Sequence, residues 1–223
     1  CSPNVIAMLP ELKNIANRLV VKASPMLDVT NTLRELPDST DIYVTGTRTE
    51  CKELLALADF HVSTVTPAIH AMTDGAGTYT FTLEDEAMAT VKFGVPETGD
   101  ILYEPYPTVM KSGPFKLLSQ QFGVTKFCAN THLYFSKELH EEFPGDKWRI
   151  DRVIEFSSRE IKAFPRTYPQ INVAVRNFGW SAEKLKAKLK TKDGGDLRMI
   201  AATAEGDRKL MLILSKSQSH DKS

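Results

Sequence analysis

Residues 1–92 alternate between segments with helical spacing of apolar residues and segments with strand-like patterns. Apolar residues recur at helical spacing in residues 4–19, 29–36 and 50–59, with Pro10 interrupting the first of these helices. Strand patterns occupy residues 18–23, 41–47, 68–73 and 78–83, and the last two predict a hairpin. The strand–helix–strand order predicts a parallel sheet with crossover helices, in which residues 18–23 form a buried strand.

The predicted sheet lacks its expected beginning, because doubly wound domains usually start with a strand and its phosphate-binding loop. Here the chain opens on a helix instead. A parallel sheet also needs both of its faces covered, and the predicted elements are too few to do so. We therefore expect residues 1–92 to be the back half of an α/β domain whose front half is absent from this chain.

The pattern changes after residue 92. Residues 93–145 are rich in aromatic residues, Pro and Gly, and they predict a loop, a short helix around 106–121 and a strand at 132–136. Residues 146–216 predict a compact α+β arrangement. Its predicted elements are strands at 147–156 and 171–178, a hairpin of 197–204 with 208–215, and helices at 157–164 and 181–190, N-capped by Ser157 or Ser158 and by Ser181. We expect residues 217–223 to be a disordered tail.

The composition is that of an ordinary globular protein, with 42% hydrophobic and 25% charged residues. No apolar run approaches the roughly 20 residues of a membrane-spanning helix, and the first residues show no signal-peptide pattern. Cys1, Cys51 and Cys128 are widely spaced and have no His at ligand spacing. We therefore expect no disulfide framework, no metal site, no membrane partner and a reducing, cytoplasmic location.

Charge is unevenly distributed along the chain, although the formal net charge is +0. Residues 1–145 hold 11 basic and 18 acidic residues, and residues 146–223 hold 17 and 10, so the two parts carry −7 and +7. The basic part indicates an anionic partner, most commonly nucleic acid. A solvated lysine-rich surface without a partner explains the charge equally well.

One candidate site follows the predicted strand at residues 18–23. Lys22, Ser24 and Pro25 lie where that strand ends, and open α/β sheets bind ligands at the carboxyl ends of their strands. The alternative is structural, because Asp28 or Thr30 can simply cap the next helix.

A second candidate stretch is Glu50, Cys51 and Lys52 at the start of the predicted helix. A carboxylate is favourable there beside the helix dipole, and no His lies nearby to activate the Cys51 thiol, so a structural role is favoured. The glycines of residues 74–77 lead into a strand, which favours a hairpin turn over a cofactor loop.

Aromatic, amide and basic side chains are interleaved in the middle segment. Tyr103, Lys111, Asn130 and His132 are possible substrate contacts, because such groups stack on and hydrogen-bond unpaired bases. A buried, hydrogen-bonded His132 is an equally good interpretation.

Residues 181–190 predict a helix with Leu185 and Leu189 on its apolar stripe and lysines over the rest of its surface. Together with a nearby arginine, these lysines form a candidate phosphate-binding or RNA-binding face. Its members are Arg176, Lys184, Lys186, Lys188, Lys190 and Lys192. A solvated face is the alternative.

The ordered motifs VVKASPMLD, ECKEL, LYEP…KSG, NTHLY, VRNF and KLKTKDGGD resemble a known family over residues 1–216. They resemble the C-terminal portion of the bacterial class I S-adenosylmethionine-dependent methyltransferases that carry a THUMP-like C-terminal domain. The resemblance implies an α/β and α+β chain. Residues 1–92 would be the C-terminal part of the Rossmann-like methyltransferase sheet, residues 93–145 a small ferredoxin-like domain and residues 146–216 a THUMP-like domain.

The resemblance also implies an activity and a partner. THUMP domains accompany RNA-modifying enzymes, so the implied partner is RNA, chiefly tRNA, and the implied cofactor of the full-length enzyme is S-adenosylmethionine. The glycine-rich cofactor loop and the acidic-Pro catalytic loop are missing from this sequence. We therefore assign no cofactor-binding residue and expect this chain alone to be inactive.

The resemblance places Lys22, Ser24, Pro25 and residues 50–52 at the back of the methyl-transfer pocket. Lys111, Asn130 and His132 match recurring family positions without an assigned role. Two other functions remain open. One is a stand-alone RNA-binding module without catalysis, and the other is a small-molecule methyltransferase whose C-terminal domain supports folding or dimerisation.

Overall fold

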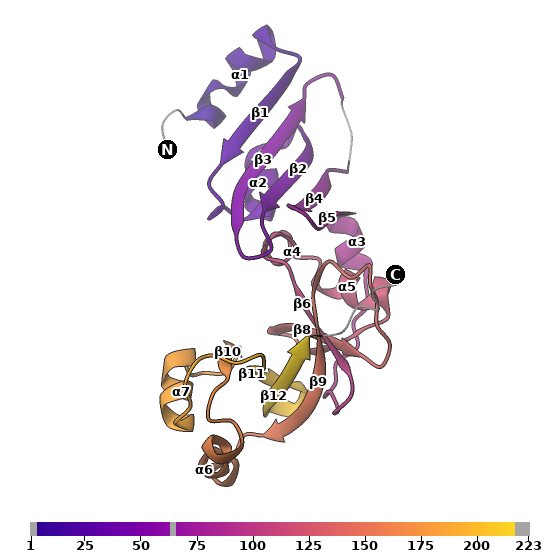
Figure 1. The fold of residues 1–223 in the computed structure, drawn as a ribbon. Helices are drawn as coiled ribbons and strands as arrows, with labels where there is room; N and C mark the ends of the chain where they lie inside the picture. The colour runs from indigo at the N-terminus through magenta and orange to yellow at the C-terminus, as the bar shows by residue number, and fades with distance from the viewer. Residues whose placement is uncertain (1–3, 63–65, 217–223) are drawn as a thin grey trace, which may run out of the picture. The chain divides into compact units, whose positions relative to one another are not determined.

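The computed structural model describes residues 4–62 and 66–216, which form two compact units (Figure 1). The first unit contains Cys1–Ala89 and Pro105–Leu117, and the second contains Thr90–Glu104 and Leu118–Ser223. Each unit has its own sheet, five-stranded in the first and seven-stranded in the second. Cys1 and the predicted tail 217–223 lie outside the described residues. No helix in the described part of the chain has the length and apolar character needed to cross a membrane.

The first unit is built on a mainly antiparallel sheet. Its elements are α1 (Val5–Ile15), β1 (Arg18–Ala23), α2 (Val29–Glu35), β2 (Ser39–Gly46), β3 (Cys51–Asp59), β4 (Ala68–Thr73), β5 (Gly77–Thr82), α3 (Leu83–Met88) and α4 (Pro107–Ser112). The strand order is β1-β3-β2-β4-β5, and among the described strands of this sheet β2 and β4 alone pair in parallel. The prediction of a parallel sheet was therefore wrong for most of its strand pairs, whereas the β4–β5 hairpin is confirmed.

Residues 51–59 are a strand, so the prediction of a helix at 50–59 was wrong. β3 lies between β1 and β2, and Leu54, Ala56 and Ala58 are buried while Leu55 and Leu57 are partly exposed. Leu, Ala, Glu and Lys favour helices intrinsically, but alternate burial in the middle of a sheet overrides that preference.

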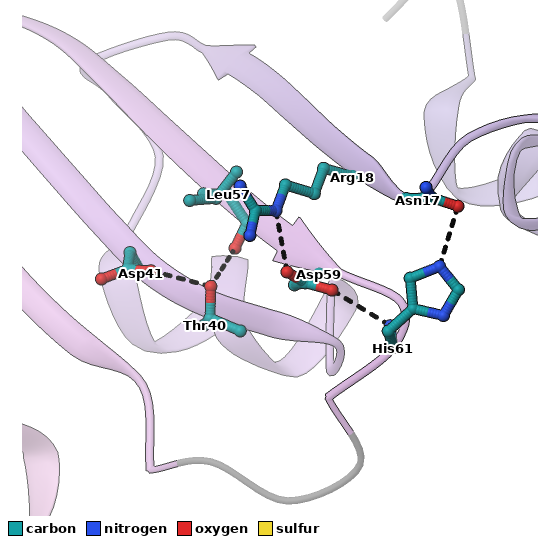
Figure 2. A network of polar contacts seen from close by, with 7 residues as sticks. All are labelled: Asn17, Arg18, Thr40, Asp41, Leu57, Asp59 and His61. Carbon is teal, nitrogen blue, oxygen red and sulfur yellow. Dashed lines mark hydrogen bonds and ion pairs between the residues drawn. The ribbon is translucent and has the colours of Figure 1, made fainter.

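β1 is an edge strand rather than the buried strand that its sequence predicts. It pairs antiparallel with β3, and Val20 is 61% exposed. Figure 2 shows how the start of β1 and the residue before it are held: Arg18 Nε donates to Asp59 Oδ2 over 2.8 Å, and His61 Nε2 lies 2.8 Å from Asn17 Oδ1. The edge strand is thus fastened by side chains as well as by its backbone ladder.

The strands β1, β2 and β4 run in the same direction, because β3 is antiparallel to both β1 and β2 while β4 is parallel to β2. Their carboxyl ends therefore lie together along one side of the sheet, which we call its carboxyl edge. α4 packs against β2, β3 and β4. The Oγ1 atoms of Thr73 and Thr108 are 2.6 Å apart at this contact. Gly46 is required there, because a Cβ would lie 2.3 Å from the Glu50 carbonyl oxygen and 3.0 Å from Thr108 Cγ2.

The remaining elements complete the chain. They are β6 (Ile101–Pro105), α5 (Phe115–Phe122), β7 (Thr125–Cys128), β8 (Thr131–Ser136), β9 (Gly145–Glu155), α6 (Ser158–Thr167), β10 (Asn172–Arg176), α7 (Ala182–Leu189), β11 (Arg198–Ala204), a 3₁₀ turn (Glu205–Asp207) and β12 (Arg208–Lys216). The helix predicted around 106–121 is two helices, because Gly113 adopts φ 85 and Pro114 follows it. Ser157 and Ser181 cap α6 and α7 as predicted.

The seven-stranded sheet has the order β10-β11-β12-β9-β6-β8-β7 and separates two hydrophobic cores. Alternate residues of β11 show this: Met199 and Ala201 face α6 and α7, while Ile200 and Ala202 face a second core with Leu102. β11 also contacts β7 and β8, so the sheet curls around the second core.

Candidate functional site

The Lys22–Pro25 stretch lies at the carboxyl edge of the first sheet, where its polar side chains contact other protein groups. Lys22 Nζ is 2.5 Å from Glu53 Oε1, and Ser24 Oγ accepts a hydrogen bond from the Met26 amide over 3.2 Å. Asp28 caps α2 by accepting a hydrogen bond from the Asn31 amide, which is the capping role that the sequence offered as the alternative to a ligand site. Lys22 and Ser24 remain solvent-accessible, but the structure shows each with a partner.

Residues 50–52 lie near the same edge, since Ala23 pairs with Leu54 at the end of β1. Glu50 and Lys52 form an ion pair with one another. Cys51 is half-buried, and burial raises the pKa of its thiol while the Lys111 charge opposes that rise. The structure thus brings together Cys51 and Lys111, two candidates that the sequence assigned to different sites. A protonated thiol at neutral pH supports the structural role predicted for Cys51.

A hollow of about 420 Å³ opens beside the β4–β5 turn. It is lined by Thr45, Gly46, Met72, Thr73, Asp74, Gly75, Gly77 and Thr78. Arg48 Nη2 donates to the Gly75 carbonyl over 3.1 Å and lies above the Tyr106 ring. The turn leads into β5, so no helix N-terminus faces the hollow. These residues do not fit a nucleotide-cofactor clasp, which agrees with the hairpin interpretation.

His70 is a polar centre that sequence analysis did not single out. Its Nε2 lies 2.9 Å from Asp41 Oδ1, its Nδ1 lies 3.0 Å from Thr80 Oγ1, and Tyr43 stacks on its ring. The strand register places these side chains next to one another, because Tyr43 of β2 pairs with His70 of β4 and His70 pairs with Thr80 of β5. Both ring nitrogens are engaged, and no metal-binding group of three or more His, Cys, Asp and Glu exists among the described residues.

Tyr103 is placed in the core of the second unit. The side chain is 0% exposed, and its hydroxyl donates to the Glu138 carbonyl over 2.6 Å and accepts from the His140 amide over 2.9 Å. Burial raises the pKa of Tyr103. Its ring also packs against Phe143, so Tyr103 offers no face for stacking on a base in this conformation.

His132 and Asn130 lie close together in the chain but differ in environment. Asn130 is exposed in the turn between β7 and β8. His132 is half-buried in β8, and burial, with a smaller contribution from the Lys126 charge, lowers its pKa to about 4. His132 is therefore neutral at pH 7, as a buried histidine would be.

The lysines of α7 and of the residues just after it fall into two groups. Leu185 and Leu189 are buried as predicted, and Lys188, Lys190 and Lys192 are exposed beside them. The other two are engaged: Lys184 Nζ lies 5.3 Å from the centroid of the Trp180 ring, and Lys186 Nζ is 2.5 Å from Asp193 Oδ2.

Arg176 is not on the lysine face. It binds Glu104 of β6 through Nε over 2.7 Å, and Arg198 Nη2 reaches the other carboxylate oxygen over 3.0 Å. The Glu104 side chain is only 14% exposed. Sequence analysis missed this arginine–glutamate–arginine cluster, because strand order alone brings its members together.

Comparisons with known proteins identify two segments of the chain. Residues 102–144 match a family described as a ferredoxin-like domain, and residues 145–216 match a family described as THUMP domain-like. A solved structure from Porphyromonas gingivalis W83, described as a "putative methyltransferase", matches 98% of this chain at 28% sequence identity with a TM-score of 0.92. This chain spans 56% of that protein's chain. No curated protein matches. The predictions of ferredoxin-like and THUMP-like segments are confirmed.

Proposed function

We propose that this chain forms part of an S-adenosylmethionine-dependent RNA methyltransferase and that its second unit binds the RNA, with tRNA as the substrate. The observation that carries the proposal is the THUMP domain-like match over residues 145–216, which contain the exposed lysines in and just after α7. The likeness to the Porphyromonas gingivalis structure supports the reaction class. A cytoplasmic location belongs to the same proposal.

The RNA-binding face in this proposal centres on Lys188, Lys190 and Lys192. These side chains are exposed, so phosphates can approach them without displacing a protein group. Lys184 and Lys186 would first leave Trp180 and Asp193, and Arg176 would have to leave a largely buried carboxylate. We therefore assign phosphate contacts to the exposed lysines and a smaller part to the other members of the predicted set.

S-adenosylmethionine would supply the methyl group in this proposal. We assign none of the described residues to the cofactor. In this proposal the back of the methyl-transfer pocket is formed by Lys22, Ser24, Pro25 and residues 50–52. Such a pocket gains rate chiefly by positioning the acceptor atom. Asn130 is the exposed member of the proposed substrate contacts.

Fluorescence anisotropy with labelled bulk tRNA tests the RNA-binding part. A Lys188→Gln/Lys192→Gln variant removes two exposed charges from the α7 end, and a Lys92→Gln/Lys209→Gln variant removes two exposed charges elsewhere in the second unit. We expect affinity to weaken steeply between roughly 50 and 200 mM salt and the α7 variant to have the shallower salt slope. The control variant should behave as the wild type.

Three results would contradict the proposal. Absence of tRNA binding at low salt would exclude RNA as the substrate and favour a small-molecule methyl acceptor. Equal loss in the two variants would show that charge in general, and not the α7 face, attracts the RNA. Tight tRNA binding without methyl transfer by the full-length protein would favour a binding module without catalysis.

A further inference from the structure

A second hollow, of about 440 Å³, lies in the second unit where β9, β10 and β11 begin and β12 ends. It is lined by Trp148, Asn172, Gly195, Asp196, Leu197, Arg198, Ser215 and Lys216. We define these residues as the strand-end pocket. Its volume lies in the range of small-molecule sites, which is large enough for a mononucleotide.

The wall formed by the glycine turn before β11 is fixed by side chains outside the turn. Asn172 Oδ1 accepts from the Gly194 amide over 3.1 Å, and Asn172 Nδ2 donates to the Gly195 carbonyl over 3.0 Å. Gly194 has φ 124, and a Cβ there would lie 2.1 Å from Gln170 Nε2. The turn therefore needs glycine and is held in one shape.

The pocket combines cationic and apolar groups. Lys216 is exposed and forms no ion pair with another described residue. Arg198 lies over the Trp148 ring, 5.2 Å from its centroid, and shares Glu104 with Arg176. Leu197 is half-buried at the rim. Two cations suit a phosphate, and an indole and a leucine suit the less polar base or ribose.

The Trp148 indole adds a hydrogen-bond donor. Its Nε1 is buried and has no hydrogen-bond partner among the described residues, which is uncommon for a buried N–H. A ligand oxygen that reached Nε1 would satisfy this donor. Asp196, at the rim, can accept from a ribose hydroxyl or a base amino group.

We propose that the strand-end pocket binds a nucleoside monophosphate unit, with the phosphate on Lys216 and Arg198 and the nucleoside against Trp148 and Leu197. The unit comes either from a free mononucleotide or from one nucleotide of an RNA strand. In the second case the inference deepens the proposed function, because it gives the second unit a contact to a single nucleotide in addition to the α7 lysines.

Tryptophan fluorescence tests the pocket without RNA. The protein has 2 tryptophans, so a Trp180→Phe background leaves Trp148 as the reporter. Titration with AMP, CMP, GMP and UMP should give a saturable change, and the corresponding nucleosides and inorganic phosphate alone should bind more weakly. Lys216→Gln should weaken binding by about tenfold, the loss of one charge-assisted contact. Lys209→Gln, at the other end of β12, should not.

Glu104→Gln should change nucleotide affinity in the opposite direction to Lys216→Gln. Removing the carboxylate leaves Arg198 free to face the phosphate, so nucleotide affinity should rise in a protein whose circular dichroism shows that it is folded. The absence of saturable binding by every mononucleotide, or equal affinity in Lys216→Gln and Lys209→Gln, would overturn the proposal.

A tRNA titration of the same variants separates the two sources and the two proposals. Weaker tRNA binding by Lys216→Gln would identify an RNA nucleotide, and unchanged tRNA binding with lost mononucleotide binding would identify a free mononucleotide. Mononucleotide binding without any tRNA binding would leave the pocket standing and contradict the proposed RNA function. If tRNA affinity is the same in every pocket variant and no mononucleotide binds, the proposed RNA function stands and the pocket proposal is contradicted.

Discussion

Arg176 donates a hydrogen bond from Nε to Glu104 Oε1 over 2.7 Å, although the two residues are 72 positions apart in the chain. Arg198 binds the second oxygen of the same carboxylate. One acidic side chain of β6 therefore neutralises two basic side chains of β10 and β11. The net charge of +7 over residues 146–223 consequently overstates the positive charge that this unit offers to a ligand.

Glu104→Gln should lower the free energy of unfolding by about 1–3 kcal/mol, because the change leaves two arginines facing a neutral amide in a partly buried place. Urea denaturation of the protein measures the effect. Glu205→Gln, at an exposed position in the turn before β12, should change stability by less than about 0.5 kcal/mol. Equal effects of the two substitutions would show that the cluster contributes nothing specific.

Tyr103→Phe should destabilise the protein by about 1–3 kcal/mol, because the Glu138 carbonyl and the His140 amide lose the hydroxyl as a partner. Affinity for tRNA should stay that of the wild type, since the ring is buried. Thermal unfolding and anisotropy on the same sample check both statements. A loss of affinity without a loss of stability would return Tyr103 to the substrate contacts.

His132 should make stability depend on pH between about 4 and 6.5. The unfolded chain takes up a proton on this histidine as the pH falls below 6.5, while the folded protein does not until about pH 4. Stability from this residue is therefore complete above pH 6.5 and decreases as the pH falls toward 4. His132→Gln should remove that part of the pH dependence in denaturation curves, and an NMR titration that gives an ordinary pKa for His132 would disprove it.

Gly46→Ala should destabilise the first unit by about 1–3 kcal/mol, because the added methyl group meets the Glu50 carbonyl and Thr108. Denaturation of the variant measures this cost. A Gly46→Ala/Thr108→Ser double variant removes the side-chain contact and keeps the backbone contact. It should recover only part of the stability, and full recovery would place the entire strain on Thr108.

Local patterns were sufficient for many elements of the fold. Ser157, Ser181 and Asp28 sit at helix starts because each side chain accepts from a backbone amide three residues later, which the sequence shows directly. The hairpin around residues 205–207 and the buried stripe of Leu185 and Leu189 are equally local. Such features need no knowledge of the sheet.

Features that depend on strand order could not be predicted in the same way. Residues 51–59 have helix-favouring composition, and only their place between β1 and β2 makes them a strand. Cys51 and Lys111 interact because α4 returns to the first sheet after β6 has started the second. The same limit hid the strand-end pocket, whose residues lie on or beside four strands that only the order of the sheet brings together.

The boundary between the two matched segments, at residues 144 and 145, runs through a continuous hydrogen-bonded sheet, because β6 of the first segment is the neighbour of β9 of the second. Recombination at that point would leave β9 with an open edge and divide the core that Leu102 shares with Ile200. Each matched segment therefore needs the other to complete its sheet and its hydrophobic core.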